Sequence, residues 1–380
     1  MLAVTGWQTA ASLCYYSLFA ATAYFRDTFG ISRTLIGVLA TVAMLGYTLN
    51  LFPSGAAVDG FGERRVMLGG LLGLAAMAGL VAAAPSFAVL LGAAFLLGAF
   101  YATAMPASNR GIVTSAPAGR AGFAMGLKQV GVTAGSGAAA LIVAGVATCA
   151  TWRWGFAVIA MVAGAYALLF RATYLGSVGY GRWALPNFSR LRGNRPYLLL
   201  LVAGLFIGAA VFTTVGYTLL YANEAARIPV VLAGIVLAGV QATGSLGRLG
   251  AGALADRLGG GRAAASVTAC LVGAATVLFG LLAVATPPPA LVVPLLLGIG
   301  LTILGCTGVY YSCLTAMVGA GEVGAATAGG QTAINLGGML VPPAFGYLAD
   351  TTGYSAGWSL LAGCGLTAAV LVLAVRAAAA

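Results

Sequence analysis

Long apolar segments, separated by short polar turns, follow one another along almost the whole chain. A helix that crosses a bilayer needs about 20 predominantly apolar residues. About twelve segments satisfy this requirement, at residues 5–25, 34–56, 65–84, 87–110, 119–147, 153–171, 197–221, 229–254, 262–285, 289–316, 323–348 and 356–377. The sequence therefore predicts an all-α integral membrane protein with about twelve transmembrane helices.

The composition excludes several other classes of protein. Only 7% of the residues are charged, whereas a soluble domain carries about 25%. The net charge of +11 comes from basic residues in short loops, which favours a lipid bilayer rather than a nucleic acid as the partner. The chain has no histidine, few acids and no CxxC pair among its six cysteines. We therefore expect no enzymatic activity, no metal and no cofactor.

Two internal echoes predict a duplicated structure. Gly55-Ala-Ala-Val-Asp59-Gly-Phe-Gly62 and Gly252-Ala-Leu-Ala-Asp256-Arg-Leu-Gly259 share one pattern and stand 197 residues apart. A second pattern, from Gly119 through Gln129 and Gly135, recurs 202 residues later from Gly321 through Gln331 and Gly337. We predict two pseudo-symmetric six-helix bundles, at residues 1–172 and 196–380, joined by a linker at 173–195. Many transporters are built from such repeats.

The distribution of basic residues predicts the orientation in the membrane. With these spans, twelve of the eighteen basic residues lie on the side of the Asp59 and Asp256 turns, and four lie on the other side. The positive-inside rule then places both termini and the linker in the cytoplasm. Residues 1–7 contain no basic leader, so we expect no signal peptide. The expectation is a multi-pass protein of the cell (inner or plasma) membrane that acts as a monomer.

The twelve spans, the basic linker and the motif Gly55-x-x-x-Asp59-x-x-Gly62-x-Arg-Arg65 together resemble the major facilitator superfamily. The resemblance covers the whole chain, although Gly60 stands where a basic residue is usual. It implies two bundles that alternate about a central site, with a cavity lined by the first, fourth, seventh and tenth spans. On physical grounds Asp59 is either a gate residue that pairs with an arginine or caps a helix, or a simple turn former. The expected gating residues are Asp59, Arg65, Arg110, Arg120, Asp256 and Arg262.

Two basic residues are predicted to lie well inside the membrane. Lys128 is eight residues beyond Arg120, and Arg248 is eight residues before Asp256, which places both about 12 Å from the same membrane surface. A charge at such a depth is a functional candidate by default. Two alternatives remain open at this point: Lys128 snorkels to the surface, or Arg248 binds carbonyls or Gln241 as a packing residue.

The segment Arg248-Leu-Gly-Ala-Gly252-Ala-Leu-Ala-Asp256 is also similar to the eighth helix of the monocarboxylate and oxalate/formate carriers. In that group an arginine at this place binds the substrate carboxylate. Lys128 has no clear counterpart in that group. The resemblance therefore implies that Arg248 binds an organic anion, while the role of Lys128 rests on its charge and its position.

The expected substrate site combines these two cations with neutral side chains. Hydroxyl, amide and ring groups on the expected helices suit a small anion, and the candidates are Gln129, Tyr15, Tyr16, Tyr101, Asn109, Tyr217, Gln241, Tyr310, Gln331 and Asn335. We expect secondary active or facilitative transport of a carboxylate by alternating access, as exchange (antiport) or substrate-limited uniport, because an empty carrier would close poorly. The alternatives are efflux of neutral or anionic drugs or metabolites on the same fold, and a transporter-like sensor or receptor.

Overall fold

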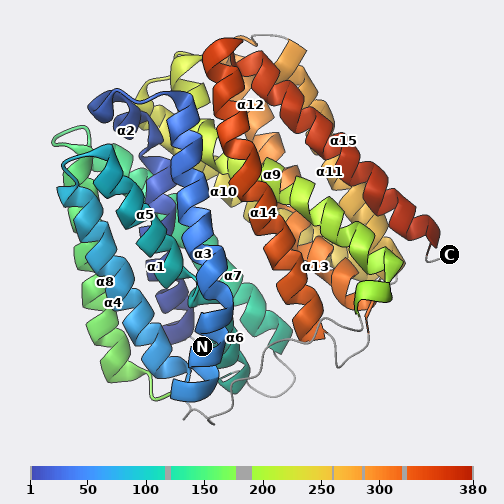
Figure 1. Cartoon of the computed structure of the whole chain (residues 1–380), viewed down its shortest axis with the longest axis horizontal. Helices are drawn as coiled ribbons and strands as arrows, with labels where there is room; N and C mark the ends of the chain where they lie inside the picture. Colours follow the sequence, from blue (N-terminus) through green and yellow to red (C-terminus); the bar gives the residue numbers. More distant parts are fainter. Residues whose placement is uncertain are drawn as a thin grey trace. The chain divides into compact units, whose positions relative to one another are not determined.

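The computed structural model describes residues 2–115, 121–176, 191–258, 261–284, 287–318 and 323–378, and these residues form helices without strands (Figure 1). The helices are α1 (Leu2–Ala20), α2 (Thr22–Phe29), α3 (Arg33–Phe61), α4 (Glu63–Ala83), α5 (Phe87–Tyr101), α6 (Ala104–Ser115), α7 (Ala121–Val146), α8 (Trp152–Thr173), α9 (Arg195–Glu224), α10 (Val230–Arg257), α11 (Gly261–Val284), α12 (Pro289–Ile299), α13 (Cys306–Ala316), α14 (Val323–Thr351) and α15 (Tyr354–Ala378). A 3-10 turn, η1 (Leu191–Gly193), precedes α9, and a π-helical segment, η2 (Gly300–Leu304), joins α12 to α13.

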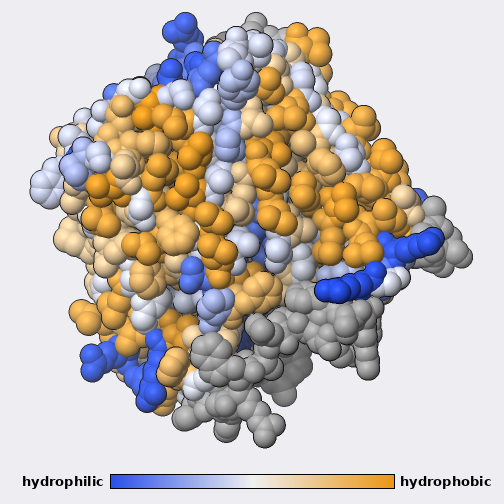
Figure 2. All heavy atoms as spheres, in the orientation of Figure 1, coloured by the Kyte–Doolittle hydropathy of each residue, from blue (hydrophilic) through white to orange (hydrophobic). Residues whose placement is uncertain are grey.

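The predicted fold class is confirmed. In the described part of the chain, nine helical segments are long and apolar enough to cross a membrane, and residues 130–146 of α7 form a shorter apolar helix. The predicted spans at 5–25, 119–147 and 323–348 correspond to α1 with α2, to α7 and to α14. Large apolar side chains such as Leu72, Leu168 and Leu366 are exposed, and Figure 2 shows hydrophobic residues over much of the visible face. Such a surface is suited to lipid.

The helices group into two compact units. Unit 1 contains residues 1–30, 42–185 and 230–238, and unit 2 contains residues 31–41, 186–229 and 239–380. In unit 1, α1 packs on α7 and α8, and α4 packs on α8; in unit 2, α9 packs on α14 and α15, and α11 packs on α15. The two units therefore use the same pairing pattern, as a duplicated sequence should. The division at 173–195 remains a prediction.

Glycines of the second sequence echo occupy equivalent places in the two units. A Cβ added to Gly135 of α7 would collide with the backbone carbonyl of Thr9 on α1, and a Cβ added to Gly337 of α14 would collide with that of Leu205 on α9. These helices approach closely because glycine removes the side chain at the crossing, which is how membrane helices gain packing contacts in lipid.

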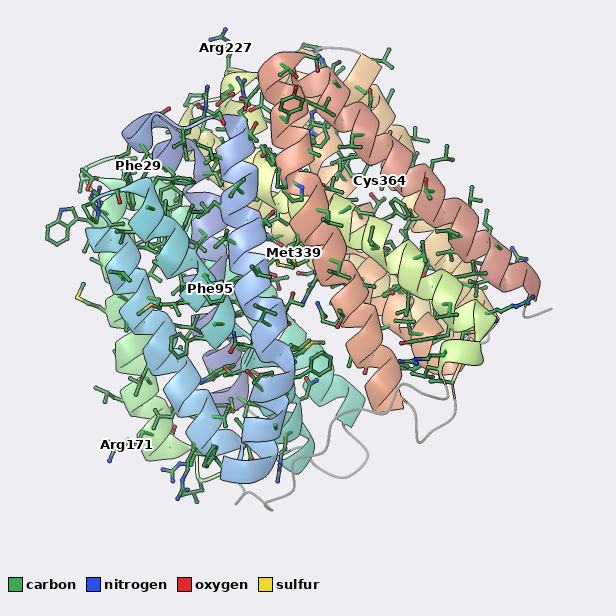
Figure 3. The ribbon with its side chains drawn as sticks, in the orientation of Figure 1. Phe29, Phe95, Arg171, Arg227, Met339 and Cys364 are labelled. Carbon is green, nitrogen blue, oxygen red and sulfur yellow. The ribbon has the colours of Figure 1, made fainter. Side chains whose placement is uncertain are left out.

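Two predicted helices are interrupted in ways that the apolar pattern does not show, and a third carries prolines in its interior. The predicted span 87–110 breaks at Ala102 and Thr103, between α5 and α6, and the span 289–316 contains η2. Helix α14 carries Pro342 and Pro343 in its interior. Proline lacks the N–H that would bond the carbonyl four residues back, so Pro343 cannot donate to the carbonyl of Met339. The hydroxyl of Thr41 donates to this carbonyl instead (Met339 is labelled in Figure 3).

Candidate functional site

Lys128 is the single lysine of the sequence, against seventeen arginines. It lies on α7 in unit 1 and is only 5% exposed, so it does not reach the surface as a snorkelling residue would. Its Nζ donates to Oδ1 of Asn109 on α6, at 2.5 Å. Among the described residues this neutral amide is the partner of the ammonium group, and no carboxylate joins it. A buried cation with a neutral partner retains the charge that an anion would neutralise.

A chain of polar side chains follows α1 beside this residue. Ser108 of α6, next to Asn109, donates to Oε1 of Gln8 at 3.0 Å, and Nε2 of Gln8 donates to Ser12 at 3.3 Å. The hydroxyls of Ser12 and Tyr101 lie 3.0 Å apart. All of these side chains are buried. Unit 1 therefore contains an internal polar path that ends at a tyrosine.

The aromatic candidates of unit 1 form a cluster at the end of this path. The rings of Tyr15 and Tyr101 stack at 4.4 Å, and Tyr16 meets both edge-on. The ring of Tyr47 of α3, which was not among the predicted site residues, has its centroid 5.7 Å from that of Tyr101. The hydroxyl of Tyr15 donates to the sulfur of Met44 at 3.1 Å. The structure thus brings the predicted tyrosines of α1 and α5 together, largely as a packed aromatic core.

Arg248 lies on α10 in unit 2, against the π-helical segment η2. Its Nε donates to the carbonyl of Leu304 and to the hydroxyl of Thr307, both at 3.1 Å. Thr307 in turn donates to the same carbonyl at 2.8 Å. The contact with a carbonyl is the packing interaction that the sequence analysis left open. It also fixes one edge of the guanidinium group, and π-helical segments are common at functional sites.

Glycines allow α10 to reach η2. A Cβ on Gly247 would collide with the carbonyl of Leu301, and one on Gly244 would meet the side chain of Leu304. Unit 1 has a counterpart, because a Cβ on Gly46 of α3 would collide with the carbonyl of Phe95 (labelled in Figure 3) on α5. Close approach of backbones therefore places Arg248 beside the carbonyl that it binds.

The polar candidates of α13 and α14 form a second network in unit 2. Tyr311 donates to Oε1 of Gln331 at 2.5 Å, and Nε2 of Gln331 donates to Oδ1 of Asn335 at 2.8 Å. Tyr311 and Gln331 stand 202 residues after Asn109 and Gln129, whereas the residue 202 after Lys128 is Gly330. The repeat therefore carries a lysine at this position in unit 1 and a glycine, next to Gln331, in unit 2.

Three further candidates for the substrate site have a defined place in unit 2. The hydroxyl of Tyr310 donates to the carbonyl of Leu200 at 3.0 Å. The hydroxyl of Tyr217 lies 2.6 Å from the carbonyl oxygen of Arg33 and 3.0 Å from that of Pro342. Gln241 is a buried residue of α10. The hydroxyls of both tyrosines are therefore engaged with backbone.

The predicted gating residues are only partly within the described residues. The side chains of Asp59 and Arg262, and the whole of Arg120, lie outside them, as does the side chain of the substrate-site candidate Gln129, while Arg65 and Asp256 are exposed. At the first duplicated turn, Gly62 has φ +83°, as its role in reversing the chain requires. Arg110 binds the carbonyl of Val58 at 3.2 Å and pairs with Glu63 at 3.5 Å. Fully buried Glu63 also accepts from Tyr174 at 3.3 Å; its role was not predicted, because the sequence shows it only as a charge within the turn motif.

A second charged group, which we call the Arg33 cluster, comprises Arg33, Thr34, Glu224, Asp350 and Tyr354, all in unit 2. Nη2 and Nε of Arg33 lie 2.6 Å and 2.7 Å from Oε2 of Glu224, which also accepts from Tyr354 at 2.9 Å. Asp350 accepts from the backbone N–H groups of Arg33 and Thr34 at 3.0 Å and 2.9 Å, and from the Thr34 hydroxyl at 2.7 Å. The carboxylate of α14 thereby caps the N-terminus of α3.

The electrostatics of the Arg33 cluster follow from this geometry. Burial opposes ionisation of Asp350, but the hydrogen bonds from Thr34 and Arg33 outweigh it and hold the pKa of this carboxyl below its ordinary value. Asp350 lies two residues beyond the apolar span predicted to end at 348. Glu224, which the sequence places at the end of the span 197–221, is committed to Arg33, whereas Asp27 is exposed on α2.

These arrangements suit binding and gating rather than covalent chemistry. Among the described residues, no group of histidine, cysteine or acidic side chains has the spacing of a metal site. The polar networks and the cations lie within helices, several of them interrupted, which is how transporters build sites for polar solutes.

Comparisons with known proteins agree with this reading. Residues 6–328 match the model of the Major Facilitator Superfamily. A search of curated proteins found no match. A bacterial homolog of the human lysosomal transporter Spinster, solved in an inward-facing and occupied conformation, shares 15% identity, with a TM-score of 0.76 over 99% of this chain and 94% of that one.

A mutant of the nucleoside transporter NupG shares 14% identity, with a TM-score of 0.81 over 98% of this chain and 99% of that one. At such identities the likeness concerns the fold alone. The family match covers most of the sequence, and its expectation of a membrane transporter rather than an enzyme agrees with the helices described above. The chain therefore belongs to the Major Facilitator Superfamily.

Proposed function

We propose that this protein transports a small organic anion, most simply a carboxylate, across a cell membrane by alternating access. The observation that carries the proposal is Lys128, a buried cation whose partner among the described residues is the neutral amide of Asn109. A charged side chain within a membrane span costs at least about 2.5–3.5 kcal/mol. An anionic substrate offsets this cost by supplying the missing negative charge.

The identity of the residue supports the same conclusion. A chain with seventeen arginines uses its one lysine at this position. Lysine presents a compact point charge with three rotatable donors, whereas arginine presents a rigid fork. One donor is used by Asn109, and the proposal assigns the others to the substrate. Arg248, anchored at Nε by Leu304 and Thr307, supplies the positive charge of unit 2.

Uptake into proteoliposomes tests the proposal. Purified protein is reconstituted and assayed by counterflow with radiolabelled carboxylates, such as oxalate and lactate, beside lipophilic dyes. We expect Lys128→Met to abolish carboxylate uptake, because methionine keeps the length and removes the charge, and Arg248→Ala to do the same. Arg376→Ala, at an exposed position of α15, serves as the control and should transport normally.

Two results would reject the proposal. If Lys128→Met transports carboxylates at the parent rate, the buried charge is not part of the substrate site. If the parent exchanges dyes and no carboxylate, the protein is an efflux carrier for neutral or lipophilic compounds.

A further inference from the structure

The network of Tyr311, Gln331 and Asn335 in unit 2 ends in an unsatisfied polar group. Asn335 is fully buried, its Oδ1 accepts from Gln331, and its Nδ2 has no hydrogen-bond partner among the described residues. A buried amide edge without a partner is costly, so such a group in a folded protein calls for an explanation.

Two neighbouring hydroxyls on α9 share this property. Thr213 and Thr214 are fully buried, and neither hydroxyl has a partner among the described residues. Threonines within helices usually donate to a carbonyl one turn back, as Thr218 does to Thr214 at 2.7 Å and Thr332 does to Ala328 at 2.9 Å. Thr213 and Thr214 depart from that pattern.

The packing of α9 on α14 sets these groups at similar levels. A Cβ on Gly208 would collide with the carbonyl of Ile334, and one on Gly338 would meet the ring of Phe212. Asn335 therefore lies level with residues 208–212 of α9, and Thr213 begins the next turn. The three unsatisfied groups occur within about one turn of each other along two packed helices.

The parts of the three helices that carry these groups contribute no charge of their own. Residues 196–223, 306–316 and 323–349, which cover the relevant parts of α9, α13 and α14, include no aspartate, glutamate, lysine or arginine. In the repeat, Lys128 of unit 1 corresponds to Gly330 of unit 2, next to Gln331. The helices around Asn335 therefore offer neutral amide and hydroxyl groups, and a nearby cation of unit 2 is Arg248 of α10, which bonds Thr307 of α13.

We infer that Asn335, with Gln331 and the hydroxyls of Thr213 and Thr214, forms a neutral subsite that binds an uncharged hydrogen-bonding group of the substrate. The inference rests on the proposed function and narrows it. The transported anion is a carboxylate that also carries a hydroxyl, carbonyl or amide group. A site built to bond such a group discriminates strongly against the analogue that lacks it.

Matched pairs of ligands test the inference on the purified full-length protein. Lactate is compared with propionate, and 3-hydroxybutyrate with butyrate, by thermal-shift titration, since ligand stabilisation rises with concentration over Kd. We expect the parent to bind the hydroxylated member of at least one pair about tenfold or more tightly. In Asn335→Leu this ratio should fall to about one, with the Kd of the unsubstituted acid unchanged.

The stability of the empty protein separates this role from a structural one. Replacing an unpartnered buried hydroxyl with a methyl group of the same size is neutral or stabilising, so Thr213→Val and Thr214→Val should unfold at the same or a higher temperature than the parent. Asn335→Leu also removes the acceptor of Gln331 Nε2, so for this variant the ligand ratio decides. Thr332→Val is the matched control on α14, because the Thr332 hydroxyl already bonds Ala328, and it should leave the ratio intact.

Each outcome has one meaning. If carboxylates bind in a Lys128-dependent manner but both members of every pair bind equally, the neutral subsite is wrong and the proposed function stands. If Asn335→Leu lowers the unfolding temperature and keeps the ratio, the amide is a structural group that bonds an internal water. If no carboxylate stabilises the protein, the proposed function fails and the subsite with it.

Discussion

Removal of the Asp350 carboxylate should weaken the contact between α14 and the N-terminus of α3 in unit 2. Three groups at the start of α3 donate to this carboxylate within 3.0 Å, and its side chain is 22% exposed. Loss of a helix cap costs about 1 kcal/mol, and loss of a carboxylate at a helix N-terminus adds up to about 1 kcal/mol. Asp350→Ala should therefore cost about 2 kcal/mol. At 1.4 kcal/mol per factor of ten, the population in which α3 leaves α14 rises about thirtyfold.

Asp350→Asn provides the graded control. Asparagine is as good a helix cap as aspartate, so this variant should lose only the charge term of up to about 1 kcal/mol and shift the same population by up to about fivefold. The two substitutions thus distinguish geometry from charge at a single position.

Cysteine accessibility measures the shift. Thr41→Cys, two turns along α3, is introduced where the native hydroxyl bonds the Met339 carbonyl, in a background without the native cysteines. When opening is fast relative to labelling, the maleimide rate in detergent follows the open population. A cysteine at exposed position Thr352 controls for general reactivity. Equal labelling of Asp350→Ala and the parent at position 41 would refute the capping role.

Two other substitutions examine the packing that positions the site. Thr307→Val removes a partner of the Arg248 Nε and should raise the KM for carboxylate uptake about fivefold to tenfold, with recovery in Thr307→Ser; an unchanged KM would show that the Leu304 carbonyl alone orients the guanidinium. Gly337→Ala places a methyl group against the Leu205 carbonyl and should destabilise the protein by about 1–3 kcal/mol, seen as a lower unfolding temperature, whereas Gly363→Ala, which meets open space, should leave that temperature unchanged.

The membrane spans were accessible from the sequence because lipid imposes a simple rule. Every spanning helix needs a long apolar run, and such runs fix element type without any periodicity. The interruptions were not accessible in the same way. The π-helical segment at Gly300–Leu304 lies inside an unbroken apolar run, where α10 approaches it closely through Gly244 and Gly247, a tertiary contact that the run does not show.

The residues of the candidate site likewise fall into those that the sequence predicts and those that only the fold reveals. Lys128 and Arg248 were identified because a charge inside an apolar run is conspicuous in the sequence. The partners of these residues were not, since Asn109, Leu304 and Thr307 are ordinary residues until the fold brings them together. Asn109 was selected, but as a substrate ligand rather than as the partner of Lys128.

The Arg33 cluster was missed altogether, for a physical reason. Arg33 and Asp350 stand 317 residues apart, and each looks like a charge at the end of a span. A signal was available in principle, because Arg33 and Glu224 are opposite charges at span ends that the positive-inside count places on one side. The positive-inside count predicts the orientation of the chain, but it does not predict which charges on one side form ion pairs.

The solitary lysine of α7 also has a practical consequence. Growth on lysine enriched with isotopes at Cε and Nζ places the probe in one side chain of this protein, because the sequence contains a single lysine. Its magnetic resonance signal would arise from the interior of the bundle, without background from any other side chain. On the proposed function, a change in this single spectral line would report binding of the substrate at Lys128 directly.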